Sequence, residues 1–367
     1  MPHFGNCPWL RFCSPLERGI SDRQVISRGG RCSEVIRASP GTGALNHKGR
    51  RVSRRKCKDR LPWGKYIAAM AAYAACYELT RHCSVSYWML YAGLRLSCLL
   101  LLPRRFWTPI AIGEALPVVT NALICIRDLG VLTTIFGSSP IIVLCMPVVM
   151  AFRRHMRLFQ PGGEVNMTMI VGCTLACSVI TAVVIDMAFV AYLLHAANEK
   201  STPFSISPAI PLLLVYFLGA FQGALTLTPS VLALRERFKC KEFSVRGVLR
   251  CSLTRDLAFG AVPILAAMVL LAQVSSGGTL MLARLSMAIP VFVLTLRHGW
   301  HGGAFGGLLA SFAIAMTATI VREPGMIQAQ AVMAVALSTC LLFGQKAVAA
   351  RNADMPARAY RRRHGGV

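Results

Sequence analysis

The sequence predicts an all-α protein, a polytopic bundle of about ten helices that crosses a membrane repeatedly. The first observation is composition: of 367 residues, 55% are hydrophobic and only 15% are charged, whereas a soluble domain carries roughly 25% charged residues. The second is that windows of about 20 apolar residues, the length that a spanning helix requires, recur along most of the chain. The third is that lysine and arginine gather in alternate loops between these windows.

The first 63 residues differ from the rest. They carry fourteen Lys/Arg and four acidic residues up to Arg60 and show no hydrophobic periodicity, so they cannot bury enough apolar surface to fold alone. They do not read as a secretory signal, because no apolar run begins before Tyr66. Two interpretations stay open: a basic, disordered cytoplasmic tail, or sequence upstream of a true translation start near Val52 or Met70. We favour the second.

The membrane domain is predicted to occupy residues 64–350, followed by a short basic cytoplasmic tail at 351–367. Within it we expect ten apolar segments, of which the first and the seventh are the shortest. Their approximate limits are 65–80, 84–102, 106–126, 130–152, 166–194, 210–234, 257–274, 278–296, 303–321 and 326–348.

Loop charges predict that both termini are cytoplasmic. With the first tail inside, the inner loops hold thirteen Lys/Arg and the outer loops only four, and the last tail adds five arginines inside. Positive residues concentrate on the cytoplasmic side of membrane proteins and hold it against anionic headgroups. We therefore expect a multi-pass protein of a bacterial inner membrane, with anionic lipid as a partner.

Four charged residues lie deep inside the apolar segments: Arg95, Glu114, Asp186 and Arg284. Each costs at least ~2.5 kcal/mol at membrane depth unless it meets protein or water. Counted from the segment ends, Arg95 and Glu114 are level in the inner half, and Asp186 and Arg284 are roughly level in the outer half. Because pairing offsets the loss of hydration, the sequence predicts two ion pairs, Arg95–Glu114 and Asp186–Arg284.

A polar stripe extends the first pair. Glu114, Pro117 and Asn121 follow i, i+3, i+7 spacing, which places them on one helix face. Together with Arg95, Asp186 and Arg284, Glu114 and Asn121 are the candidates for coupling a ligand to helix positions. The alternative, that the charges only fix helix register, is given equal weight.

Several other chemistries find no support. Lysines in the apolar segments stand only near segment ends, and no histidine lies at membrane depth, so neither a retinal Schiff base nor a bis-histidine haem is expected. We predict no catalytic residues, no metal and no cofactor, because no nucleophile stands at a suitable distance from a base. Nucleic acid is not an expected partner, since no aromatic residue is interleaved with the basic ones between Phe12 and Trp63.

Short motifs resemble the first-described type of the MASE family, the bacterial membrane-associated sensor domains. The resemblance runs from about Tyr66 to Arg351. The early motifs are a Trp and a Gly on one helix, a basic turn with an aromatic-x-Pro, and a Gly on the next helix. The residues that match them are Trp88, Gly93, Arg104-Arg105-Phe106-Trp107-Thr108-Pro109 and Gly113. The later motifs match Thr228-Pro229 and Arg297-His298-Gly299, which is followed by the glycine-rich Gly302 to Gly307. The chain departs from the family where Met89-Leu90-Tyr91 replaces the consecutive prolines that often follow the Trp.

The resemblance implies a sensory membrane module that is not itself an enzyme. Family members usually precede a kinase, cyclase or phosphodiesterase module, whereas here only the tail to Val367 follows. Output would then depend on a partner, such as a signalling kinase, a cyclase or another membrane protein. Two alternatives remain at this point: a secondary transporter or permease, since helix-breaking prolines and buried charges also mark transport sites, and a structural membrane subunit.

Overall fold

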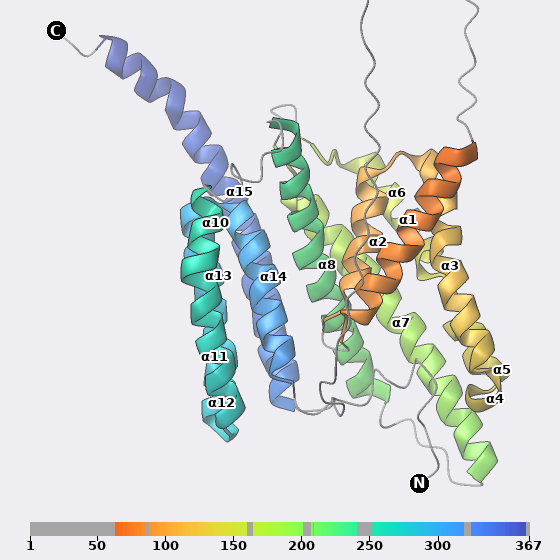
Figure 1. The fold of residues 1–367 in the computed structure, drawn as a ribbon. Coiled ribbons are helices and arrows are strands. Elements are labelled where there is room, and N and C mark those ends of the chain that lie inside the picture. Colours follow the sequence, from red (N-terminus) through yellow and green to blue (C-terminus); the bar gives the residue numbers. More distant parts are fainter. Residues whose placement is uncertain are drawn as a thin grey trace, which may run out of the picture.

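The computed structural model describes residues 63–85, 88–159, 164–200, 207, 209–240, 251–318 and 324–364. Within these ranges the chain is helical, with two isolated bridges and no named strand. The predicted basic tail at 1–63 lies, except for its last residue, outside the described residues. The helices stand side by side in one bundle whose long axis is vertical in Figure 1.

The first helices form a compact group. α1 (Trp63–His82) runs down in the view of Figure 1, α2 (Leu90–Leu101) runs up, and α3 (Trp107–Ile124) runs down again after a single turn, η2 (Arg104–Phe106). α2 begins six residues later than the predicted segment at 84, after a point where the backbone groups of Val85 and Trp88 bond each other. Pro103 follows the end of α2, where a residue without an N–H is tolerated.

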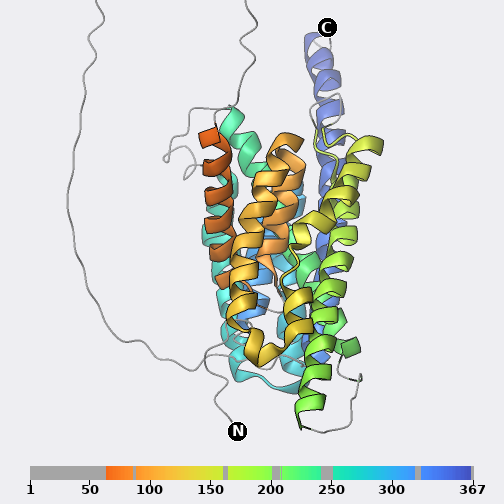
Figure 2. The same cartoon turned by 90° about the vertical axis from the view of Figure 1, so that its right-hand side faces the viewer.

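The next segment is broken twice. α4 (Ile126–Leu129), α5 (Val131–Gly137) and α6 (Ile141–His155) are separated at Gly130, which has φ 79°, and at Pro140. A positive φ suits glycine, which has no Cβ to clash. Two long helices follow, α7 (Met167–Lys200) and α8 (Ala209–Cys240). They pack against each other, with α8 in the middle of the bundle in Figure 1 and α7 along the side that faces the viewer in Figure 2.

The second half of the chain covers one side of α8. It comprises α10 (Ser252–Asp256), the single π-helical turn η3 (Leu257–Ala261), α11 (Val262–Val274), α12 (Gly277–Ser286), α13 (Ala288–His298), α14 (Trp300–Met316) and α15 (Pro324–His364). α15 continues through most of the predicted basic tail, so residues 351–364 are helical and project beyond the bundle (Figure 1).

Seven helical stretches in the described part are long and apolar enough to cross a membrane: Arg104–Ile124, Val131–His155, Met167–Glu199, Ala209–Phe238, Ser252–Val274, Gly277–His298 and Gly325–Ala347. A multi-pass membrane protein is therefore confirmed. The other three predicted segments correspond to α1, which carries several charged residues, α2 with 12 residues and α14 with 17. The count of ten and the cytoplasmic termini stay predictions.

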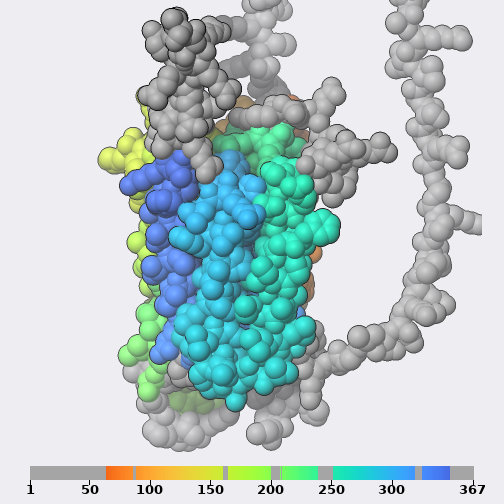
Figure 3. Space-filling view, turned by 90° about the vertical axis from the view of Figure 1, so that its left-hand side faces the viewer, coloured from red at the N-terminus to blue at the C-terminus, as the bar shows by residue number. Residues whose placement is uncertain are grey.

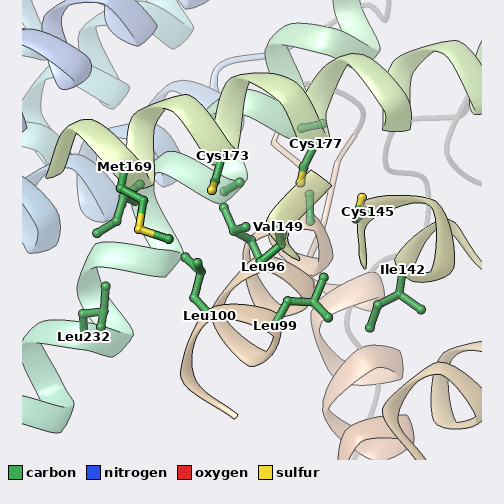
Figure 4. Packing of buried hydrophobic residues seen from close by; sticks show 14 of the residues in the cluster. Leu96, Leu99, Leu100, Ile142, Cys145, Val149, Met169, Cys173, Cys177 and Leu232 are labelled. Atoms are coloured by element: carbon green, nitrogen blue, oxygen red, sulfur yellow. The ribbon is translucent and has the colours of Figure 1, made fainter. Parts of the chain in front are cut away.

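Leucine, methionine and cysteine side chains fill the core where α2, α6, α7 and α8 meet. Figure 4 shows Leu96 and Leu100 of α2 on the side of Cys173 and Cys177 of α7, and Leu99 on the side of Ile142 of α6. The cysteines lie among apolar side chains, where a thiol packs as a small hydrophobe. This packing fixes the position of α2, the helix that carries Arg95.

The bundle has one strongly basic end. The turn η2 and the ends of α6, α8 and α13 lie at the top in Figure 1, together with the start of α10. We call this the basic end; the arginines that define it are Arg104, Arg105, Arg153, Arg154, Arg235, Arg255 and Arg297. It corresponds to the side predicted to face the cytoplasm.

Candidate functional site

The Arg95–Glu114 ion pair predicted from the sequence is present in the bundle interior. Arg95 Nη2 lies 2.9 Å from Glu114 Oε1, and Arg95 Nε contacts both carboxylate oxygens at 3.2 and 3.1 Å. The two side chains are only 2% and 1% exposed. The planar guanidinium thus binds the carboxylate through two nitrogens, the geometry that gives arginine–carboxylate pairs their strength and direction.

Two further donors hold the carboxylate of Glu114. The hydroxyl of Tyr73 on α1 donates to Oε2 at 2.8 Å, and the backbone N–H of Ile142 on α6 donates to Oε1 at 3.1 Å. Ile142 stands in the first turn of α6, where N–H groups lack partners within the helix. A buried carboxylate needs such donors to replace water, so Glu114 connects α1, α2, α3 and α6.

Arg95 in turn reaches α7. Its Nη1 donates to Thr181 Oγ1 at 3.3 Å, and its guanidinium carbon lies 5.7 Å from the ring centre of Tyr91. The hydroxyl of Thr181 donates to the carbonyl of Cys177 at 2.9 Å. We call Tyr73, Arg95, Glu114, Thr181 and the N–H of Ile142 the Glu114 cluster. It joins five helices.

The Glu114 cluster borders one of two adjoining cavities. Glu114, Tyr77 and Tyr91 line a small cavity of about 30 Å³. It shares Gly137, Ile185 and Ala188 as walls with a larger cavity of about 120 Å³ between α3, α5, α7 and α8.

The larger cavity is mainly aromatic and apolar, with Phe189, Tyr192 and Tyr216 among its walls. The hydroxyl of Thr133, a buried side chain in its lining, has no hydrogen-bond partner among the described residues. Such a cavity suits a small, mostly apolar molecule with one hydrogen-bonding group.

The second predicted ion pair, Asp186–Arg284, is wrong. The guanidinium of Arg284 on α12 donates instead to Thr317, at 3.1 Å to Oγ1 and 2.8 Å to the carbonyl oxygen. Asp186 lies on α7, and its Oδ1 has no hydrogen-bond partner in the described part of the chain. Matching depth did not make these residues neighbours, because α12 packs mainly against α11, α15 and α13.

Asn121 does not join the Glu114 cluster. Its Nδ2 donates to the carbonyl of Pro117, four residues earlier in α3, at 2.8 Å. Seven residues of helix also separate it from Glu114 by about 10 Å along the axis. The residues of the predicted polar stripe therefore lie on α3, but Glu114 alone of them belongs to the Glu114 cluster.

The early motif residues Trp88 and Gly93 attach α2 to α8. Trp88 is buried, and its Nε1 donates to Thr226 Oγ1 at 3.3 Å. A Cβ on Gly93 would lie 2.6 Å from the carbonyl oxygen of Gly223, so only glycine permits this approach. Small residues at such crossings let helix backbones come close in membranes.

The basic turn and the start of α3 are held in a similar way. Trp107 is buried and lies under the guanidinium of Arg153, which also donates to the carbonyls of Leu99 and Leu102 at the end of α2. Pro109 stands in the first turn of α3, where its missing N–H costs no helical bond. A Cβ on Gly113 would meet the Met70 carbonyl oxygen at 2.8 Å, which fixes the contact with α1.

The later motif residues organise α8 and the basic end. Pro229 is buried within α8, and the hydroxyl of the preceding Thr228 donates to the Gly93 carbonyl at 3.3 Å. Gly299 has φ 64° and separates α13 from α14. Arg297 extends toward Asp256 at 3.4 Å and is 64% exposed. Most motif residues thus set helix crossings and turns.

Three members of the Glu114 cluster were not predicted. Tyr73 forms an i, i+4 pair with Tyr77, and this tyrosine pair inside an apolar segment was a usable signal. The Thr181 hydroxyl and the Ile142 N–H gave none, because a single threonine or a backbone group in an apolar run is ordinary. Among the described residues no group of three His, Cys, Asp or Glu side chains could hold a metal ion.

The comparisons with known proteins agree with the motifs. The model of MASE1, a family of membrane-associated sensor domains, matches residues 64–351, which is most of the chain. No curated protein and no solved structure matches. The chain therefore belongs to the MASE1 family of membrane-associated sensor domains.

Proposed function

We propose that this protein is a sensory and signalling module of a bacterial inner membrane that has no catalytic activity of its own and acts through a partner protein. Family membership supports the sensory role. The observation that carries the proposal further is the Glu114 cluster, where one carboxylate connects four helices beside a cavity.

The Glu114 cluster supplies a means of coupling. Any molecule or membrane state that alters the contacts of Glu114 changes the relative positions of α1, α2, α3 and α6, because all four meet at this carboxylate. A ligand shifts such an equilibrium only by its different affinity for the two arrangements. The adjoining cavity between α3, α5, α7 and α8 gives a small apolar ligand a place to act.

Gly137 allows a direct test. It lines both cavities, and a Cβ there would meet nothing within 4 Å. Gly137→Leu should therefore add a side chain at the wall shared by the two cavities without a backbone clash. We expect it to abolish the response to stimulus in a strain that reports the output of a partner kinase or cyclase. Gly278→Leu, also in open space, is the matched control and should respond normally. Unchanged output after deletion of the gene would refute the sensory role.

The proposed orientation can be tested with two exposed positions. Cys83 follows α1 at the end opposite the basic end and is exposed, and Cys251 precedes α10 at the basic end and is partly exposed. In single-cysteine variants, a membrane-impermeant maleimide added to intact cells should label Cys83 and leave Cys251 unmodified until the cells are opened. Labelling of Cys251 in intact cells would contradict cytoplasmic termini.

A further inference from the structure

A second space lies far from the Glu114 cluster, on the outer surface of the second half. It is a groove of about 530 Å³ between η3–α11 on one side and α12–α13 on the other. Figure 3 shows the face of the molecule on which these helices lie side by side. The stretch Ser252–Val274 is only 17% buried, less than the other membrane-spanning candidates. The groove therefore faces the lipid.

Small side chains and a wide helical turn open this groove. η3 is a π-helical turn, and its wall of the groove includes Gly260 and Ala261. The facing wall includes Ser286 and Pro290. These residues leave space that larger side chains would fill, while Ile264 and Val293 keep the surface apolar along the helices.

The groove ends in charge at the basic end. Arg255, Asp256 and Arg297 line it there. Asp256 is engaged by two other groups, His298 Nε2 at 3.0 Å and Arg297 at 3.4 Å. The lining at this end thus includes two arginines and one carboxylate, so the rim carries excess positive charge. Guanidinium groups bind phosphate through paired hydrogen bonds.

The dimensions favour a thin occupant. A helix is about 10 Å across with its side chains, so the volume of the groove would hold only about four or five helical residues. An acyl chain is far narrower and matches the apolar walls over their length. A neutral headgroup would gain little from Arg255 and Arg297, whereas a phosphate without a balancing cation complements them.

We infer that this groove binds one anionic phospholipid, with an acyl chain between α11 and α13 and the phosphate at Arg255 and Arg297. The site shares no residue with the Glu114 cluster or its cavities. It is independent of the sensory function proposed above, and it would tie the positions of α10 to α13 to the charge of the surrounding lipid.

Native mass spectrometry of the full chain tests the headgroup. The purified protein is incubated with phosphatidylglycerol or, separately, with phosphatidylcholine of the same acyl chains. We expect a retained adduct of phosphatidylglycerol at least fivefold more abundant than that of phosphatidylcholine. The double variant Arg255→Ala/Arg297→Ala should lose this preference. Arg104→Ala/Arg105→Ala, which removes two exposed arginines of the same end outside the groove, should keep it.

A second variant tests the groove itself. A Cβ on Gly260 would meet nothing within 4 Å, so Gly260→Trp should fill the groove and abolish retention while the melting temperature is unchanged. Gly278→Trp, equally open, should retain lipid like the wild type. Equal retention of both lipids, or full retention by Gly260→Trp, would overturn the inference. The inference would also be overturned if the wild-type protein without lipid is a dimer and Gly260→Trp dissociates it. The groove would then bind a second copy of the chain.

Discussion

Two ion pairs in this molecule use the same chemistry in opposite surroundings. Arg95 and Glu114 meet at 2.9 Å with 2% and 1% of their side chains exposed, whereas Arg297 and Asp256 meet at 3.4 Å with 64% and 25% exposed. Breaking a buried pair strands a charge away from water, whereas exposed pairs contribute little. The interior pair therefore fixes helix positions, and the pair at the basic end leaves its arginine accessible to other partners.

The largest effect is expected from Glu114→Ala. It leaves the guanidinium of Arg95 buried without its carboxylate, which should lower the free energy of unfolding by about 3–5 kcal/mol. Unfolding by detergent titration of the purified protein measures this. The charge exchange Arg95→Glu/Glu114→Arg is the companion variant and should recover part of the loss. If the exchange is no better than either single change, the pair does not carry the stability assigned to it.

A smaller loss is expected from Gly93→Leu, which tests whether the interior pair depends on the packing of its helix. The new side chain would collide with the carbonyl of Gly223 on α8, and overpacking of this kind costs about 1–3 kcal/mol. Displacement of α2 should also weaken the contact between Arg95 and Glu114. The same detergent titration serves, with Gly278→Leu as control. Wild-type stability would show that α2 and α8 do not meet as closely as described.

The smallest effect is expected from Asp256→Asn at the basic end. The change removes the negative charge that faces His298 and Arg297 but leaves an amide oxygen that can still accept a hydrogen bond, and the site is open to solvent, so the loss should be small. The free energy of unfolding measured by the same detergent titration should not change measurably. A decrease as large as that caused by Gly93→Leu would remove the contrast between the two pairs.

The sequence was sufficient to predict the Arg95–Glu114 pair because its two segments are consecutive. A short turn joins them, so α2 and α3 must run in opposite directions close together, and equal depth then brings the charges within reach. The helical fold could be predicted for the same reason, since apolar length alone specifies spanning helices.

The depth of a charged residue in the membrane could not show which residue it contacts when the two helices are far apart in the sequence. Asp186 and Arg284 lie on α7 and α12, and their separation across the bundle depends on how every helix between them packs. The donors from Tyr73 and Ile142 depended on that packing as well. The ion pair between consecutive helices could therefore be predicted from the sequence. The other contacts of the Glu114 cluster could be identified only from the packing of all the helices.

The last helix has a mechanical consequence. α15 is continuous over 41 residues, about 60 Å at 1.5 Å per residue, while the hydrocarbon core of a bilayer is about 30 Å thick. Roughly half of it therefore lies outside that core when the helix stands upright. If the helix tilts by a few degrees about a point within the bundle, its far end moves several times further than the part that lies at the membrane surface. The protein thus carries a built-in lever arm whose outer end is residues 351–364.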